Sequence, residues 1–132
     1  MTQEDKELLL KDLCARLPYK VKVCLYKKEA CILMGIDGNE VYLDVDSDSF
    51  YVENIKPYLR PMSSMTEDER KYIEDKCAFT TIGPIGGNFS LVMPVIAAEW
   101  LIDFYNSHHL DWRGLIRMGL ALEAPEGMYD IK

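Results

Sequence analysis

The chain has few glycines and prolines, no long apolar run and no excess of positive charge. Gly and Pro account for 8 and 6 of its 132 residues, which excludes a collagen-like or linker-like chain. The longest apolar run, residues 91–98, contains a proline and falls far short of the about 20 residues that a transmembrane helix needs. Only 15 basic residues stand against 22 acidic ones, for a net charge of −7. This balance argues against nonspecific nucleic-acid binding, which requires clustered basic groups.

The cysteines and the first residues indicate a reducing compartment. No pair among Cys14, Cys24, Cys31 and Cys77 has the spacing of a CxxC zinc or redox site. Buried thiols are therefore expected, with a bridge between the second and third cysteines across a hairpin left open. The opening MTQEDKELLL is acidic and lacks the basic segment of a signal peptide. We expect a cytoplasmic protein with no membrane association.

The residues that are present predict one hydrophobic core. Hydrophobic residues make up 48% of the chain, and its length is close to that of a common single domain. We therefore expect residues 1–132 to form one domain. Thr2 and Asp5 have the spacing of a helix capping box, and Leu9, Leu13 and Leu17 recur at helical spacing before Pro18. A first helix is predicted there, ending at the proline.

A switch to a period of two predicts strands between residues 19 and 55. Apolar and polar side chains alternate in four short runs, and Asp37–Gly38–Asn39 is a strong hairpin signal between the second and third. The predicted fold class is α+β, a four-stranded antiparallel meander with N-terminal and C-terminal helices packed on it. A small half-open barrel is the main alternative.

The second half predicts further helices joined by a proline-bracketed connector. Pro57 and Pro61 bracket an extended connector. Thr66 and Glu69 form a full capping box for a mostly charged helix of about residues 67–76. A wide apolar face at 95–107 predicts a long helix that is central to the core.

A last short helix and a loose tail are predicted after that. Asp111 is a candidate N-cap for a helix at 112–118, with Gly119 at its end. The tail is expected to be loose from Pro125.

None of the candidate chemical motifs is complete. Asp44, Asp46 and Asp48 resemble the start of a calcium loop, but the required Gly and bidentate Glu are missing at later positions. His108 and His109 are adjacent at a helix end and make a poor metal pair. A Cys77–His109–Asp111 nucleophilic arrangement has no supporting local motif. We predict no metal, no cofactor and no catalytic residue, with acid–base catalysis by either histidine as a minor alternative.

Three stretches carry a resemblance. The opening residues 1–19, the connector IKPYLRPMSSMT at 55–66 and the closing HHLDWRGLIRMGLALEAPEGMY at 108–129 resemble a family of small uncharacterised proteins. Members of that family are encoded by phages, prophages and mobile elements of gut bacteria. The resemblance implies a small cytoplasmic accessory protein that acts on a host or phage protein, and it supplies no catalytic residues.

The leading hypothesis is a noncatalytic protein-binding module. Residues 61–132 hold 6 basic and 11 acidic groups, a net of −5, against 9 and 11 in residues 1–60. Exposed tyrosines favour protein interfaces. The predicted partner surface comprises Tyr58, Arg60, Met62, Glu67, Asp68 and Glu74. A homodimer is left open.

The alternative hypothesis is a protein that binds or sequesters a nucleotide or metabolite. Residues 83–88 are the most glycine-rich stretch and are predicted to form a mobile loop over the ligand. The predicted ligand site comprises Gly86, Gly87, Asn88, Trp100 and Trp112.

Overall fold

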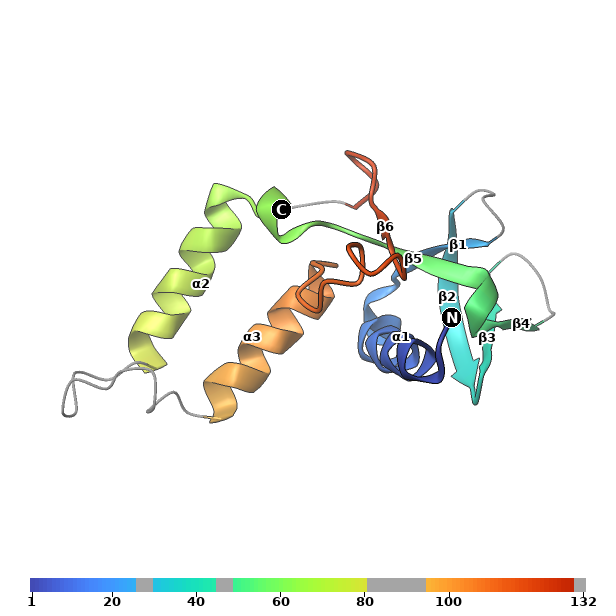
Figure 1. The fold of residues 1–132 in the computed structure, drawn as a ribbon. Coiled ribbons are helices and arrows are strands. Elements are labelled where there is room, and N and C mark those ends of the chain that lie inside the picture. The colour runs from blue at the N-terminus through green and yellow to red at the C-terminus, as the bar shows by residue number, and fades with distance from the viewer. Residues whose placement is uncertain (26–29, 45–48, 81–94, 130–132) are drawn as a thin grey trace.

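The computed structural model has helices and strands in one α+β arrangement, as the sequence predicts (Figure 1). The structure describes residues 1–25, 30–44, 49–80 and 95–129. The helices are α1 (Gln3–Arg16), α2 (Glu67–Thr80) and α3 (Val95–Ser107). The strands are β1 (Lys22–Leu25), β2 (Ala30–Asp37), β3 (Glu40–Leu43), β4 (Ser49–Tyr51), β5 (Ile55–Leu59) and β6 (Leu122–Glu123). Three 3-10 turns, η1 (Leu17–Tyr19), η2 (Val52–Asn54) and η3 (Met62–Ser64), complete the described elements.

The sheet is larger than predicted and it is open. Its strand order is β4-β3-β2-β1-β5-β6. All neighbouring strands are antiparallel except β5 and β6, which are parallel. The sheet is therefore mixed, with six strands instead of four, and it does not close into a barrel.

The extra strands are β5, which includes the start of the predicted connector, and β6, for which no strand was predicted. In β5, Pro57 lies opposite Val23 of β1. Proline cannot donate a hydrogen bond to a neighbouring strand and is usually confined to edges or unpaired positions. Pairing with β6 begins only at Tyr58, so Pro57 has a strand neighbour on one side alone. The prolines made a connector the simpler prediction, whereas the fold tolerates one of them in a strand.

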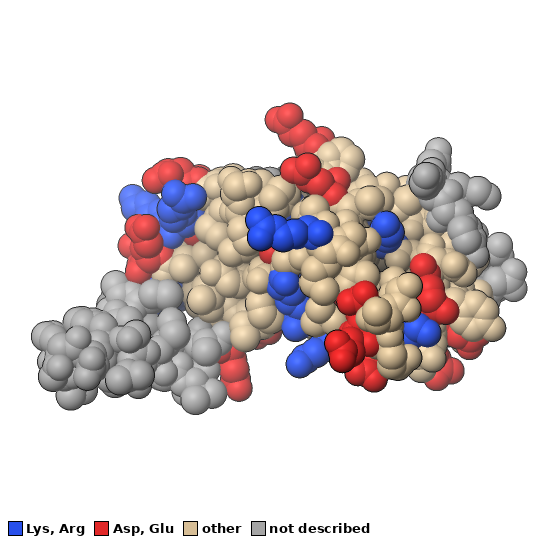
Figure 2. Space-filling view, viewed as in Figure 1, with Lys and Arg blue, Asp and Glu red and all other residues tan. Residues whose placement is uncertain are grey.

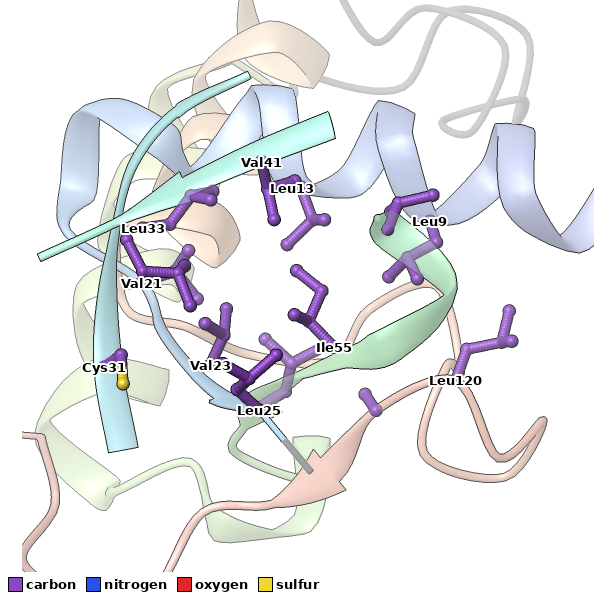
Figure 3. Packing of buried hydrophobic residues seen from close by; sticks show 14 of the residues in the cluster. Leu9, Leu13, Val21, Val23, Leu25, Cys31, Leu33, Val41, Ile55 and Leu120 are labelled. Atoms are coloured by element: carbon purple, nitrogen blue, oxygen red, sulfur yellow. The ribbon is translucent and has the colours of Figure 1, made fainter. Parts of the chain in front are cut away.

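The first helix covers one face of the sheet. The Thr2 hydroxyl accepts a hydrogen bond from the Asp5 backbone N–H at 3.0 Å, so the predicted cap is present. Leu9 and Leu13 of α1 are fully buried and point toward the sheet residues in the core (Figure 3). The core side chains labelled there also include Val21, Val23, Leu33, Val41, Ile55 and Leu120. Full burial of each large aliphatic side chain stabilises the fold by about 1.5–3 kcal/mol.

The predicted last helix is absent, and turns replace it. Residues 112–119 form turns. Asp111 stabilises these turns, because its carboxylate accepts hydrogen bonds from the backbone N–H groups of Leu115 at 2.7 Å and Ile116 at 3.0 Å. Gly114 has a φ of +78°, a left-handed conformation that interrupts an α-helix. The helix prediction and the N-cap role of Asp111 were therefore both wrong, although the Asp111 carboxylate does bind backbone N–H groups.

The cysteines divide between the interior and the surface. Cys24 and Cys31 are buried in β1 and β2, as predicted, whereas Cys14 on α1 is exposed. Cys31 lies opposite Val23, and Cys24 lies opposite Ala30. The side chain of Cys77 lies outside the described residues. No helix in the described part of the chain is long and apolar enough to cross a membrane.

Candidate functional site: an acidic, aromatic cleft between two helices

The helices α2 and α3 run side by side, away from the sheet (Figure 1). Residues of both helices line a cleft. Its volume is about 570 Å³. Residues of both helices and of η1 line it: Tyr19, Asp68, Glu69, Tyr72, Trp100, Asp103, Phe104, Ser107 and His108. We refer to these nine residues as the α2–α3 cleft.

Three aromatic rings form the floor of the cleft. The ring centroids of Tyr72 and Phe104 are 5.5 Å apart, and those of Tyr72 and Trp100 are 5.6 Å apart. Trp100 and Phe104 are also 5.6 Å apart. Phe104 is only 7% exposed and anchors the group, whereas Tyr72 is 46% exposed. The rings therefore contact one another as a continuous apolar platform that is open to solvent on one side.

Two carboxylates flank this platform without any compensating charge. Asp68 on α2 and Asp103 on α3 are both exposed. Within the described residues neither forms a hydrogen bond or an ion pair, and no lysine or arginine lines the cleft. A low-dielectric floor beside unpaired carboxylates strengthens their attraction for a cation. The Lys76 ammonium lies 5.6 Å from the Tyr72 ring centroid, within the range of a cation–π contact.

Glu69 joins the cleft to the sheet. One carboxylate oxygen accepts from the Arg60 guanidinium at 2.7 Å and from the Thr66 backbone N–H at 2.9 Å. The other accepts from Arg60 at 2.9 Å and lies 2.7 Å from Nδ1 of His108. The Glu69 backbone N–H donates to the Thr66 hydroxyl at 3.1 Å, so the predicted capping box is confirmed.

The charge state of Glu69 determines the hydrogen-bond roles of His108. Burial alone would raise the pKa of Glu69, but the hydrogen bonds from Arg60 and Thr66 and the Arg60 charge outweigh it and lower that pKa to about 2. An ionised carboxylate can only accept, so Nδ1 of His108 carries the hydrogen. Nε2 of His108 forms no hydrogen bond within the described part of the chain. The imidazole also stacks on Phe104, with centroids 4.0 Å apart.

A buried ion cluster fixes the segment that follows α3. The Asp12 carboxylate on α1 accepts from Nε of Arg16 at 2.9 Å and from Nε of Arg113 at 3.1 Å. Arg16 also donates to the backbone oxygen of Leu110 at 2.7 Å. The side chains of Asp12 and Arg16 are completely buried. The cluster therefore connects α1 to Leu110 and Arg113, which follow α3 in the chain.

The second histidine is buried behind the cleft and is held in an unusual conformation. His109 has a φ of +59° and stacks on Tyr129, with ring centroids 3.8 Å apart. Burial, followed by the nearby positive charges of Arg16, His108, Arg60 and Lys22, lowers the pKa of His109 to about 4. His109 is therefore neutral near pH 7, and its Nδ1 has no hydrogen-bond partner among the described residues.

This burial predicts an acid-sensitive contribution from His109. The unfolded chain takes up a proton at its ordinary pKa of 6.5, whereas the folded chain does so only near 4. The free energy of unfolding should therefore be largest above pH 6.5 and fall as the pH decreases from 6.5 toward 4. His109→Asn is the variant to test, because asparagine tolerates positive φ. It should be less stable than the unmodified chain, and its free energy of unfolding should depend much less on pH between 6.5 and 4. Urea unfolding at several pH values just below 6.5 measures how the free energy of unfolding of each protein depends on pH. Equal slopes for the two proteins would contradict the assignment.

The residues predicted as a partner surface do not form one surface. Arg60 is only 5% exposed and binds Glu69, so its placement on the surface was wrong. The backbone of Arg60 also pairs with the segment after α3. Tyr58 and Met62 are half-buried. Arg60 lies within the proline-bracketed segment that was expected to be an extended connector, yet a buried carboxylate compensates its charge.

The helix members of that predicted surface are exposed, but only one lies at the cleft. Glu67, Asp68 and Glu74 are exposed on α2, and Asp68 alone lines the cleft. Acidic and basic side chains are mixed over α2 on the face shown in Figure 2. The local acidic character therefore resides in the cleft more than in the whole helix surface.

The residues predicted as a ligand site are also separated. Trp100 lines the α2–α3 cleft. Trp112 does not line it, since its indole N–H donates to Asn106 at 2.9 Å and its ring lies 4.1 Å from the Arg113 guanidinium carbon. Gly86, Gly87 and Asn88 lie outside the described residues.

Sequence reasoning missed most of the cleft, although a signal was present. Trp100, Asp103, Phe104 and Ser107 follow one another at helical spacings of three, one and three residues, which places them on one side of α3. The contribution of Tyr19 could not be found this way, because it comes from a distant turn.

The described residues contain no group of three or more His, Cys, Asp or Glu side chains placed to hold a metal ion. The Asp111 carboxylate binds backbone N–H groups, so it does not orient either histidine. No protein-family model, curated protein or solved structure matches this chain. What the cleft can do is therefore argued from its own residues.

Proposed function

We propose that the protein is a noncatalytic protein-binding module and that the α2–α3 cleft binds a basic side chain of its partner. The observation that carries this proposal is the pair of uncompensated carboxylates, Asp68 and Asp103, beside an exposed aromatic floor. A cation placed there would contact ring faces and carboxylate oxygens together. Each of these contacts is stronger where water is partly excluded.

The composition of the cleft also suits a protein partner. Aromatic residues are enriched at protein interfaces because they bury a large area with few rotors to immobilise. Tyr72 and Trp100 supply such area, and Phe104 with its stacked neighbour His108 supports them from below. The carboxylates would accelerate encounter with a basic segment and give specificity for it.

The identity of the partner belongs to the same proposal. The resemblance of residues 1–19, 55–66 and 108–129 to proteins of phages and mobile elements supports a host or phage protein as the partner, met in the cytoplasm. A second copy of the chain is the alternative partner. Sedimentation of the purified protein at increasing concentration would reveal self-association.

The proposal predicts that basic peptides perturb the cleft. Short peptides of one Gly-Ser background are titrated into the full chain, carrying Lys and Arg in one series and Glu in the other. The indole N–H NMR signal of Trp100 should shift with the basic series alone. That of Trp112, which lies outside the cleft, serves as an internal reference. Removal of both cleft charges in Asp68→Asn/Asp103→Asn should weaken binding by about tenfold or more.

A matched variant separates the cleft from general electrostatics. Glu67→Gln/Glu74→Gln removes the same formal charge from exposed positions of α2 that do not line the cleft. Binding of this variant should differ from that of the unmodified chain by only a small factor. An equal loss in both double variants would show diffuse attraction instead of a binding site. The absence of any shift with basic peptides would refute the proposal.

The size of the cleft favours a second candidate function, the binding or sequestering of a metabolite. Its volume of about 570 Å³ lies within the range of small-molecule pockets. Its carboxylates disfavour phosphate-bearing nucleotides, so the metabolite would be an organic cation. A rise in melting temperature with small amines but no response to basic peptides would favour this candidate, because ligands that bind the folded state stabilise it.

A further inference from the structure

We infer that the α2–α3 cleft selects arginine over lysine as the anchoring side chain of its partner. This inference rests on the proposed function and concerns the chemistry of the bound group. It follows from the packing of the rings, from the arrangement of acceptors around them and from a similar contact elsewhere in the chain.

The rings form a platform and not a cage. A cage for an ammonium group has ring faces turned toward a common gap. Here the centroids of Tyr72, Trp100 and Phe104 lie 5.5–5.6 Å apart, with interplanar angles of 25–46°. Rings in mutual contact leave no space for a cation between them. A ligand must therefore lie on the open side of the platform, where a planar guanidinium can stack and a compact, strongly hydrated ammonium gains less.

The acceptors around the platform match a group with several spread donors. Asp68 and Asp103 approach from different helices. The Ser107 hydroxyl donates to the Phe104 backbone oxygen at 3.0 Å and keeps lone pairs for accepting. A guanidinium has five N–H donors in a fixed planar fork, whereas an ammonium has three at one point.

The protein already contains one guanidinium held in this manner. The guanidinium carbon of Arg113 lies 4.1 Å from the ring centroid of Trp112, while its Nε donates to the Asp12 carboxylate at 3.1 Å. A tryptophan face and an aspartate at the edge of the group thus bind one arginine together. The α2–α3 cleft presents the same two elements in Trp100 and its flanking aspartates, without an arginine of the described chain in place. By contrast, the Lys76 ammonium stands 5.6 Å from the Tyr72 centroid.

The test compares three peptides that differ only in their basic positions. One carries arginine, one lysine and one citrulline, which keeps the shape of arginine without its charge. Calorimetric titration into the full chain should give about tenfold tighter binding of the arginine peptide than of the lysine peptide. The citrulline peptide should show no measurable binding. Equal affinities for arginine and lysine would overturn the inference and leave the proposed function standing. No binding of either basic peptide would refute both.

Two tyrosine variants test whether the aromatic platform provides the selectivity for arginine over lysine. Tyr72→Leu removes the exposed ring and should reduce the arginine-to-lysine affinity ratio toward one. Tyr51→Leu is the matched control, because Tyr51 is 59% exposed on β4 and does not line the cleft. It should leave the ratio unchanged. Circular dichroism verifies that both variants are folded. A ratio that survives Tyr72→Leu would contradict selection by the platform.

Discussion

Replacing Asp12 with Ala is expected to destabilise the protein by about 3–5 kcal/mol, the range measured when one partner of a buried ion pair is removed. Asp12 is the only carboxylate bound to Arg16 in the described part of the chain. Without it the Arg16 guanidinium would keep a single hydrogen bond, to the backbone oxygen of Leu110 at 2.7 Å. The side chain of Arg16 is completely buried, so water cannot replace the lost carboxylate without a rearrangement of the core.

The effect extends beyond one residue pair because Asp12 also binds Arg113 at 3.1 Å. This contact joins α1 to the turns that follow Asp111. Its loss should loosen the segment that carries the hydrogen bonds to Arg60. We expect hydrogen exchange of the Leu115 and Ile116 amides to accelerate in Asp12→Ala, since both donate to Asp111 at the base of that segment.

Urea unfolding followed by circular dichroism measures the loss, and a surface pair provides the control. Lys6 and Glu53 approach to 3.7 Å, with side chains 20% and 42% exposed. Exposed pairs contribute between zero and about 1 kcal/mol, so Glu53→Ala should be nearly neutral. If Asp12→Ala costs no more than Glu53→Ala, the buried cluster contributes no net stability. A double variant with apolar residues at Asp12 and Arg16 should recover part of the loss, because the completely buried Arg16 charge is then removed together with its partner. The recovery should be partial, since Arg113 still loses its carboxylate.

The sequence predicted the features that depend on neighbours along the chain. The Thr2 cap and the full Thr66–Glu69 capping box are present, because the groups that form each of them are separated by only three residues. The helix at 95–107 was predicted with its observed bounds from the periodicity of its apolar face. The α+β class followed from the change of period after the first helix, which separates helical from strand-forming segments.

Features that depend on distant partners were not predictable. Asp12 and Arg16 have the spacing of an ordinary exposed helix pair, and only the packing of the final third of the chain buries them. Glu69 was assigned only to a helix cap, and its ion pair with Arg60 was not predicted. Glu69 performs both roles with different lone pairs. Single-sequence patterns indicate which local bond a polar side chain can make, but not which further bonds tertiary packing adds.

The α2–α3 cleft also combines local features, which could be predicted, with a contact between distant segments, which could not. The side of α3 that carries Trp100 and Asp103 could be derived from helical spacing. Its apposition to Tyr72 of α2 depends on how two helices, separated by residues that the structure does not describe, come to lie side by side. Asp68 had been assigned to the predicted partner surface, whereas Asp103 was not among the predicted site residues. Only this apposition places them at the rim of one cleft.

The second large loss of stability is expected at Glu69, whose carboxylate contacts Arg60, Thr66 and His108. Glu69→Gln should lower the free energy of unfolding at neutral pH by about 3 kcal/mol or more, because a neutral amide leaves the Arg60 guanidinium, itself 5% exposed, without a counterion. The amide is a poor replacement in either orientation. Both carboxylate oxygens accept from donors, namely Arg60, Thr66 and His108, so the NH₂ group would face another donor. Glu67→Gln, an exposed change in the same first turn of α2, should alter stability by less than about 0.5 kcal/mol.

The pH dependence distinguishes a lost ion pair from a simple loss of packing. The pKa of Glu69 is about 2 in the folded chain against an ordinary value of 4.5. Its charge therefore stabilises the fold fully above pH 4.5, and this contribution is lost as the pH falls from 4.5 toward 2. Glu69→Gln lacks this titration, so the stability gap between variant and unmodified chain should narrow over that interval. Chemical unfolding at pH values across the interval measures the gap. If the difference in stability between the two proteins stays constant down to pH 2, the packing of Glu69, and not its charge, accounts for the loss.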